Sequence, residues 1–313
     1  MAVEHVKASV LHSPKELRLE ERELPNPASN EDQIAVQSTG LGGPDLHYYS
    51  HFRNGDIIVR EPLTLDHGSA GTIISVGSEV TCLKPGDHVA LEFRSSAKAT
   101  PHAQGTLQWG INHPAKWCHK MPDHITLDLG ALVEPLSVAM HARDRAALPK
   151  RSTVLILGAG AVGLLAAAIV KVDQAKTVII ADILKDRLDF ATANGFADAS
   201  VLVPMERPQT MEDKLTFDQT VAALVKETRA NGEAVGEVTA VYQCTGVETS
   251  WRRGEVMIIG MGTPVLTIPI SAAAHSEVDI VGVFRYANTY KDIIELLANP
   301  PANMPDVIRH PKI

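Results

Sequence analysis

The stretch TVLILGAGAVGLLAAAIV (153–170) decides the fold of this chain. It runs for eighteen residues without a charge, which is at the lower edge of the length that a membrane-spanning helix needs. The spacing of Gly158, Gly160 and Gly163 favours a different interpretation, a buried parallel strand that turns into a helix packed on a sheet. The sequence has no second apolar run of this length. We therefore expect no membrane-spanning segment.

Each glycine of this GxGxxG motif has its own task in a dinucleotide-binding fold. Gly158 permits the tight turn, Gly160 lets the backbone approach a pyrophosphate, and Gly163 lets the helix pack close to the strand. The helix N-terminus then presents free N–H groups and the positive end of its dipole to the phosphates. The motif therefore predicts a dinucleotide site at the start of this helix.

An acidic residue ends the next predicted strand, VIIAD (178–182), as this kind of site requires. Asp182 would accept hydrogen bonds from the adenosine ribose, and its charge would repel a 2′-phosphate. NAD is thus favoured over NADP, although Arg187 nearby weakens the discrimination. The residues expected to bind the cofactor are Gly158, Gly160, Val162, Gly163, Asp182, Arg187 and Thr245.

The chain changes character near residue 150. Before it, short β-like segments such as IAVQSTG (34–40) and DHVALEF (87–93) are broken by turns, which predicts a largely antiparallel β domain. After it, strands and helices alternate, which is typical of a doubly wound parallel sheet. We expect an α/β protein with a β-rich domain over residues 1–150 and a Rossmann domain over residues 151–284.

Composition excludes several classes of partner. The 313 residues carry 29 Lys and Arg against 37 Asp and Glu, a net charge of −8, so neither nucleic acid nor an anionic membrane is expected. Three scattered cysteines do not form a disulfide framework and indicate reduced, intracellular thiols. The start, MAVEHVKASVLHSPKEL, lacks the apolar core of a signal peptide. We expect a cytoplasmic protein.

One connection in the predicted parallel sheet is unusually short. Only the residues 244–254, eleven in all, separate the strand that ends at Gln243 from the strand that starts at Glu255. A parallel crossover normally takes a dozen or more residues and includes a helix. We therefore expect an under-covered sheet face, with either an apolar patch that Trp251 partly fills or a distorted strand order.

Several specific strings resemble one family, the zinc-dependent medium-chain dehydrogenases, and closely its fungal polyol branch of sorbitol, xylitol and L-arabinitol dehydrogenases. The strings are GGPDLHYYSHFRNGDIIVREPLTLDHGSAG (42–71), INHPAKWCHK (111–120), LGALVEPLSVAMHA (129–142), CTGVE (244–248) and FRYANTY (284–290), together with the glycine motif. The resemblance implies a GroES-like catalytic domain with a remnant at 285–313, a Rossmann domain, and NAD-linked oxidation of a secondary alcohol in a polyol. It also implies that both domains are truncated.

The resemblance implies a catalytic zinc, but several ligand positions differ here. The family's Cys-Gly-Ser-Asp run reads Gly-Gly-Pro-Asp (42–45), and its Gly-His-Glu run reads Asp-His-Gly (66–68). His67 and Glu134 remain as candidate ligands, whereas a catalytic zinc takes three protein ligands and an open position. Two interpretations stay open: a weak site that Asp45 or Asp66 completes, and a histidine left over in the pocket.

Other positions match the family's polyol pocket. The catalytic candidates are Tyr48, His67, Glu134, Arg285 and Tyr286. The cysteine-rich lobe of the family should lie between Glu92 and Phe93, and because no Cys-x-x-Cys remains we expect no structural zinc. Cys118 and Cys244 are then expected to be buried small residues.

Three functions follow. The first is an NAD-dependent oxidoreductase for a small polyol or carbonyl, which without zinc favours carbonyl or enone reduction with Tyr48, His67 and Arg285 as hydrogen-bond donors. The second is a non-catalytic NAD-binding paralogue in an oligomer, either with itself or with an intact relative. The third is the poorly folding product of a damaged gene.

Overall fold

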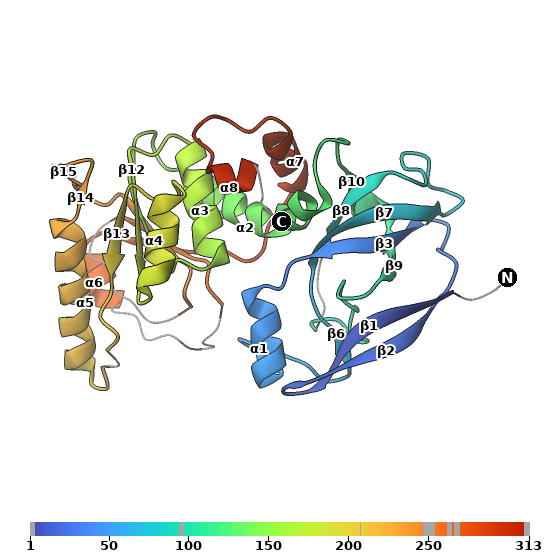
Figure 1. The fold of residues 1–313 in the computed structure, drawn as a ribbon. Coiled ribbons are helices and arrows are strands. Elements are labelled where there is room, and N and C mark those ends of the chain that lie inside the picture. Colours follow the sequence, from blue (N-terminus) through green and yellow to red (C-terminus); the bar gives the residue numbers. More distant parts are fainter. Residues whose placement is uncertain are drawn as a thin grey trace. The chain divides into compact units, whose positions relative to one another are not determined.

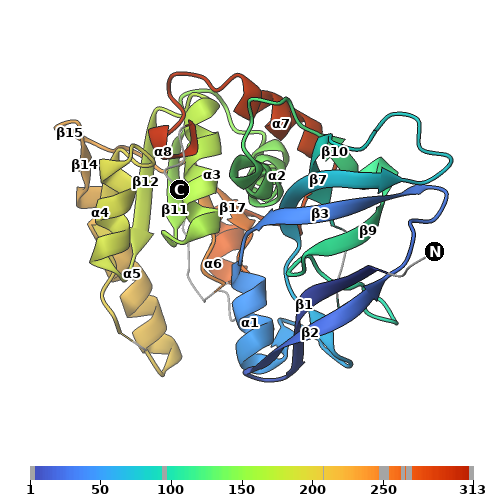
Figure 2. The same ribbon diagram turned by 45° about the vertical axis from the view of Figure 1, so that its right-hand side comes forward.

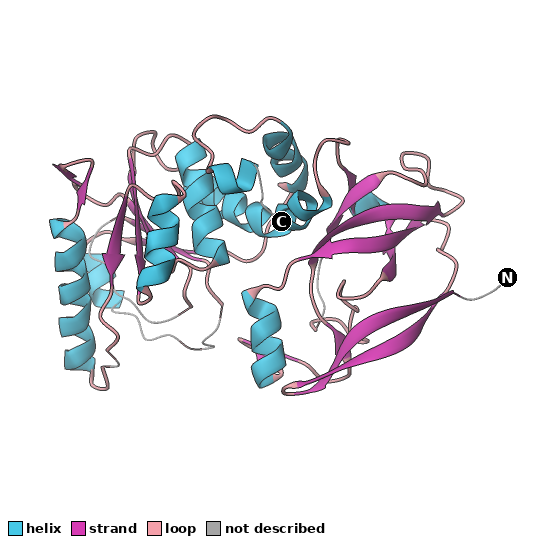
Figure 3. Ribbon diagram, viewed as in Figure 1, coloured by secondary structure: helices cyan, strands magenta, loops and turns pink. Residues whose placement is uncertain are grey.

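The protein's computed structural model describes residues 4–93, 97–206, 208–246, 254–261, 265 and 270–309. The chain divides into two compact units. The first consists of Met1–Pro135 and Asn288–Asn299, and the second of Leu136–Ala287 and Pro300–Ile313. The elements of each unit are labelled in Figure 1, turned in Figure 2 and coloured by type in Figure 3.

The first unit is built from antiparallel strands. One sheet contains β3 (Glu31–Thr39), β7 (Gly68–Val76), β8 (His88–Glu92), β9 (Gly110–Pro114) and β10 (Cys118–Lys120), in the order β10-β8-β7-β3-β9. A second contains β1 (Glu4–Ser13), β2 (Glu16–Leu24) and β6 (Leu63–Thr64), in the order β2-β1-β6, and β4 (Arg53–Asn54) pairs with β5 (Ile57–Ile58). The predicted antiparallel β domain is confirmed.

Apolar side chains of the five-stranded sheet form a core in this unit. Ile34, Ile73 and Leu91 are almost completely buried there, and Cys118 packs with them as predicted. The helices of the unit are α1 (Gly43–His51), the 3-10 helix η1 (Ala115–Trp117), the start of α2 (Leu127–Ala146) and α7 (Tyr290–Ala298). The Tyr290 hydroxyl donates to the Leu91 carbonyl at 2.9 Å, so a segment from late in the chain is fastened to β8.

The second unit contains the predicted parallel sheet. Its strands are β11 (Thr153–Leu157), β12 (Thr177–Asp182), β13 (Ala199–Leu202), β16 (Ala240–Gln243), β17 (Glu255–Ile258) and β18 (Asp279–Gly282), in the order β13-β12-β11-β16-β17-β18. Every neighbouring pair in this order is parallel. This is the strand order of a dinucleotide-binding doubly wound fold, so the predicted fold class is confirmed.

The uncharged stretch 153–170 divides into a strand and a helix, as predicted. It forms β11 and then α3 (Ala161–Val172), which is mostly buried. The other elements of the unit are α4 (Lys185–Ala193), α5 (Met211–Glu227), α6 (Ile270–His275), α8 (Asp306–Arg309) and the short pair β14 (Arg229–Ala230) and β15 (Glu233–Ala234). No helix within the described residues is long and apolar enough to cross a membrane.

The short connection leaves the strand order regular. β16 pairs in parallel with β17, with Ala240 opposite Glu255, although only eleven residues join them. The predicted distortion of the strand order is therefore absent among the described strands, and Ile280 of β18 is 41% exposed. Cys244 at the start of the connection is half-buried rather than buried. Trp251, expected to fill the gap, lies outside the described residues.

Candidate nucleotide and active site

The glycine-rich turn lies between β11 and α3 and leaves open space beside it. Gly158 has a φ of +95°, in the left-handed region, and its N–H donates to the Ala181 carbonyl at 2.7 Å. A Cβ on Gly163 would lie 1.8 Å from the Gly158 carbonyl oxygen, so the helix approaches the turn too closely for a side chain. A Cβ on Gly160, the N-cap of α3, would meet nothing within 4 Å. The turn can therefore admit an anionic group at the start of α3.

Asp182 at the end of β12 is joined to this turn. One carboxylate oxygen accepts from the Ala159 N–H at 2.7 Å and the other from the Leu184 N–H at 2.9 Å. The Arg187 guanidinium lies 3.8 Å from the carboxylate and is half exposed. The carboxylate thus fixes the turn as well as carrying the charge expected at the ribose, a second task that the motif did not reveal.

Thr245 completes the surroundings of the turn from the next strand. Its N–H and its hydroxyl both donate to Gln243 Oε1, at 2.7 and 2.6 Å. A Cβ on Gly158 would lie 2.7 Å from Thr245 Cγ2, so the threonine packs beside the turn. Val162 is half-buried in the first turn of α3. The carboxyl ends of β11, β12 and β16 thus bring the predicted cofactor residues together, which is where such folds bind dinucleotides.

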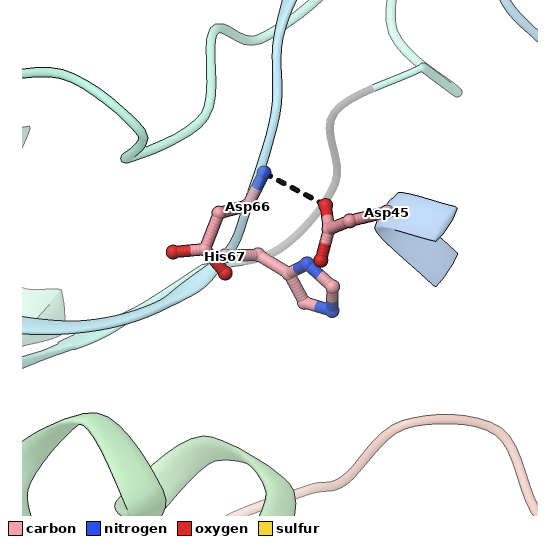
Figure 4. A group of neighbouring side chains, drawn as sticks. All are labelled: Asp45, Asp66 and His67. Atoms are coloured by element: carbon pink, nitrogen blue, oxygen red, sulfur yellow. Dashed lines mark hydrogen bonds between the residues drawn. The ribbon is translucent and has the colours of Figure 1, made fainter. Parts of the chain in front are cut away.

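A second cluster, in the first unit, gathers Asp45, Asp66 and His67 (Figure 4). Asp45 is in the first turn of α1 and is 3% exposed. Its two oxygens accept from the Gly42 N–H at 2.9 Å and the Asp66 N–H at 2.8 Å. Asp45 therefore caps α1 and ties it to the segment before β7.

Asp66 is buried in a left-handed conformation, with a φ of +71°. Its oxygens accept from the Gly68 N–H at 3.0 Å and the Thr106 hydroxyl at 2.9 Å, and Figure 4 shows its carboxylate directed away from the His67 ring. Burial raises the pKa of this carboxyl to about 6, and the charge of Asp45 adds to the rise. Sequence reasoning missed Thr106, because no motif links residues forty positions apart.

His67 faces a third carboxylate. Its Nε2 lies 3.7 Å from Glu134 Oε1, and both side chains are largely buried. Glu134 belongs to α2, so this helix and the segment before β7 together position the pair. At Gly68 a Cβ would lie 3.4 Å from both the Ala131 carbonyl oxygen and Glu134 Cβ, an ordinary contact distance, so a side chain fits there.

The remaining predicted residues lie in separate places. Tyr48 of α1 is 4% exposed and packs with Leu11 and Leu63 in a hydrophobic cluster of the first unit. Arg285 and Tyr286 follow β18 in the second unit, and both are half-buried. The Arg285 guanidinium lies over the Phe284 ring, 5.8 Å from its centre.

Comparison with known proteins matches both units. Residues 28–123 match the family described as alcohol dehydrogenase GroES-like domain, and residues 161–299 match the one described as zinc-binding dehydrogenase. The sorbitol dehydrogenase of Gallus gallus is 36% identical over 324 residues, which cover 97% of this chain and 88% of that protein. This chain belongs to the zinc-type medium-chain dehydrogenases. The sorbitol dehydrogenase of Homo sapiens is 34% identical, over 96% of this chain and 87% of that protein.

A solved dehydrogenase structure has the same fold. The L-idonate 5-dehydrogenase of Escherichia coli superimposes with a TM-score of 0.78 over 98% of this chain and 90% of that one, at 20% identity.

Membership of a zinc-type family makes the donor atoms around His67 important. Among the described residues, Asp45, Asp66 and His67 place ligand atoms within 4.8 Å of one another. All four oxygens of the two aspartates, however, already accept hydrogen bonds from the protein. The positions beside them, Gly42 and Gly68, offer no side-chain ligand.

Proposed function

We propose that the protein is an NAD-dependent oxidoreductase of the polyol dehydrogenase type, transferring hydride between a secondary alcohol or its carbonyl form and NAD. The glycine turn with its open N-terminus at α3, fastened by Asp182, is the observation that supports this most. The sorbitol dehydrogenase relatives support a polyol, or the ketose derived from it, as the substrate class. The resemblance of the quoted strings supports the fungal polyol branch.

NAD is the proposed cofactor rather than NADP. The pyrophosphate would bind the N-terminus of α3, and Asp182 would accept from the ribose hydroxyls and repel a 2′-phosphate. Arg187 reduces this repulsion because its guanidinium is near the same carboxylate.

Zinc does not fit the donor set. His67 and Glu134 provide two ligand groups where a catalytic zinc takes three, and Gly42 and Gly68 beside them offer no side-chain ligand. We therefore propose that the catalytic zinc site of the family is lost here. Without a metal, reduction of a carbonyl is chemically easier than ionisation of an alcohol, because hydrogen bonds alone then stabilise the developing negative charge on oxygen.

Hydride transfer in this proposal takes one proton from the protein. When bound, NADH would supply the hydride for the carbonyl carbon. His67 would donate the proton at Nε2 to the carbonyl oxygen, and the Glu134 carboxylate lies 3.7 Å from that nitrogen. Arg285 is the other proposed donor and Tyr286 a residue of the polyol pocket, whereas Tyr48, which is 4% exposed and packed in a hydrophobic cluster, is not retained as a donor. The reverse reaction returns the alcohol proton to Nε2.

The decisive experiment uses one purified, tag-free sample. Fluorescence titration with NADH measures cofactor binding, elemental analysis measures zinc, and absorbance of NADH follows both polyol oxidation and ketose reduction. We expect NADH binding, no zinc that depends on His67, and ketose reduction. One zinc per chain that is retained in His47→Gln and lost in His67→Gln would refute the loss of the catalytic metal site. NADH binding without turnover would leave a non-catalytic paralogue, and absent binding with no cooperative melting would indicate a damaged product.

A variant then tests the acid. His67→Gln should lower the rate of hydride transfer by about 10²–10⁴-fold, while NADH affinity stays unchanged. His124→Gln is the matched control, since His124 is exposed and distant in sequence from the cluster. We further propose that the protein acts in the cytoplasm, on a small molecule, as a homo-oligomer.

A further inference from the structure

Two histidines lie one helical turn apart on α1 and have no part in the proposed reaction. His47 is half-buried and His51 exposed. Their ring centres are 6.2 Å apart, and the ring planes are tilted by 31°. Residues four apart share one face of an α-helix, so both imidazoles stand on the same side of α1.

The helix that carries them is fixed at both ends. At its start, Asp45 accepts from the Gly42 N–H at 2.9 Å. At its end, Phe52 adopts a left-handed conformation with a φ of +56°, and its N–H donates to the Tyr48 carbonyl at 2.8 Å. The buried Tyr48 side chain anchors the middle of the helix in the core. The two imidazoles are thus held on a preformed backbone, and a ligand need not order it.

We propose that His47 and His51 form a binding site for one borderline transition-metal ion such as Ni²⁺ or Zn²⁺. Neutral imidazole nitrogen is the ligand that these ions take in proteins, and two histidines at i and i+4 of a helix present it from one face. Metal–nitrogen bonds of about 2.0–2.1 Å require the two rings to move closer together, and His51 is exposed, so its side chain can rotate toward His47. Water fills the remaining positions, so the site is open and does not resemble a buried structural one.

The donor chemistry separates this site from the cluster around His67. That cluster is rich in carboxylate oxygens and buried, whereas His47 and His51 supply two nitrogens at the surface. Hard ions such as Mg²⁺ and Ca²⁺ prefer oxygen donors and are not expected to bind at α1. Because the site uses no residue of the proposed cofactor or acid chemistry, it stands independently of the proposed function.

Calorimetric titration of the metal-free, tag-free full-length protein with Ni²⁺ tests the site. The wild type should show a one-to-one binding event that His47→Gln and His51→Gln each weaken at least tenfold. A spacing control, the double variant Tyr49→His with His51→Gln, keeps the number of histidines but places them two residues apart on different faces of the helix, and should also lose the event. Binding unchanged in either single variant, or retained in the spacing control, would overturn the proposal.

Hydrogen exchange provides a readout that does not depend on counting sites. Ni²⁺ should slow amide exchange in residues 43–52 of the wild type and leave it unchanged in the variants, because a metal bridge between turns holds the last turn of α1 closed. Melting in chelator checks that each variant is folded, and either single variant suffices if the other unfolds. Slowing elsewhere with none in α1 would place the ion outside this pair.

Discussion

Asp66 is a buried acid whose raised pKa makes the stability of the fold depend on pH. Its carboxylate is buried beside that of Asp45, and its pKa is raised to about 6, chiefly by removal from water. A raised pKa in the folded state means that folding favours the protonated acid. The stabilisation is complete below the ordinary pKa near 4 and is lost as the pH rises through about 6.

Replacement of Asp66 by Asn should remove this part of the pH dependence. Asn tolerates the left-handed backbone and keeps an oxygen for the Gly68 N–H. Melting temperatures in chelator should therefore fall from pH 4.5 to 7 less steeply in the variant than in the wild type. Asp87→Asn is a control of opposite sign, since the hydrogen bond from Lys120 lowers the pKa of Asp87. Parallel melting curves for wild type and Asp66→Asn would contradict the assignment.

Asp32 on β3 is a buried charge in an unfavourable place. It is 0% exposed, and neither oxygen has a hydrogen-bond partner at ordinary distance among the described residues. Burial raises the pKa of its carboxyl, and contact with the Cys118 thiol offsets only part of this. Asp32→Val should stabilise the protein by about 1–3 kcal/mol at pH 7, because an unsatisfied buried polar group costs that much and valine suits a strand.

Denaturant unfolding at two pH values measures that gain. At pH 4 the wild-type carboxyl is closer to its neutral form, so the gain should shrink. A stabilisation that is equal at both pH values would show that the charge is not the cause.

At the scale of the element, the turn between β11 and α3 offers a matched pair of glycines. A Cβ on Gly160 meets open space, whereas a Cβ on Gly163 would collide with the Gly158 carbonyl at 1.8 Å. Gly160→Ala should therefore fold normally and bind NADH at least tenfold more weakly, because the methyl group occupies the approach to the pyrophosphate. Gly163→Ala should melt at a lower temperature. Equal melting temperatures and equal NADH affinities in the two variants would contradict the different roles assigned to Gly160 and Gly163.

Two further glycines predict that a metal site can be rebuilt. A Cβ at Gly42 or Gly68 would meet its neighbours at 3.4 Å or more, so the backbone at both positions can carry a side chain. The double variant Gly42→Cys, Gly68→Glu should bind about one zinc per chain, since it supplies the missing ligands. Cobalt substitution should then give a thiolate charge-transfer band. Gly43→Cys with Gly68→Glu is the control, because a Cβ at Gly43 meets nothing within 4 Å, but the thiol is displaced by one residue.

For the whole molecule, the sequence predicted the large features because they are periodic or local. The glycine spacing and the acid at the end of β12 predicted the parallel sheet. The short β-like segments broken by turns predicted the antiparallel domain. The sequence did not predict contacts between segments that are distant in the chain. Nothing in the string EDQIAV indicates that the buried Asp32 oxygens lack a hydrogen-bond partner at ordinary distance among the described residues, and no motif indicates that Thr106 donates to Asp66. Likewise, the motif predicts Asp182 at the ribose, but the hydrogen bond that its carboxylate accepts from the Ala159 N–H could be seen only in the folded structure.

The two units also predict how a cofactor changes unfolding. The residues proposed to bind NADH all belong to the second unit. At 100 times its dissociation constant NADH should stabilise that unit by about 2.7 kcal/mol, a rise of roughly 5–10 °C in its calorimetric transition. Asp182→Ala should reduce the rise. An unchanged transition at saturating NADH would contradict the assignment of the site.

The eleven-residue link between β16 and β17 has a consequence for the order of folding. Because the entropy lost on closing a chain segment grows with its length, a short link brings these neighbours together at lower cost, roughly 0.6 kcal/mol less for each halving. It also lowers the mean sequence separation of contacts in this half of the sheet. We expect β16 and β17 to pair early in refolding, ahead of the pairing of β11 with β16, whose partners are separated by 82 residues between Leu157 and Ala240.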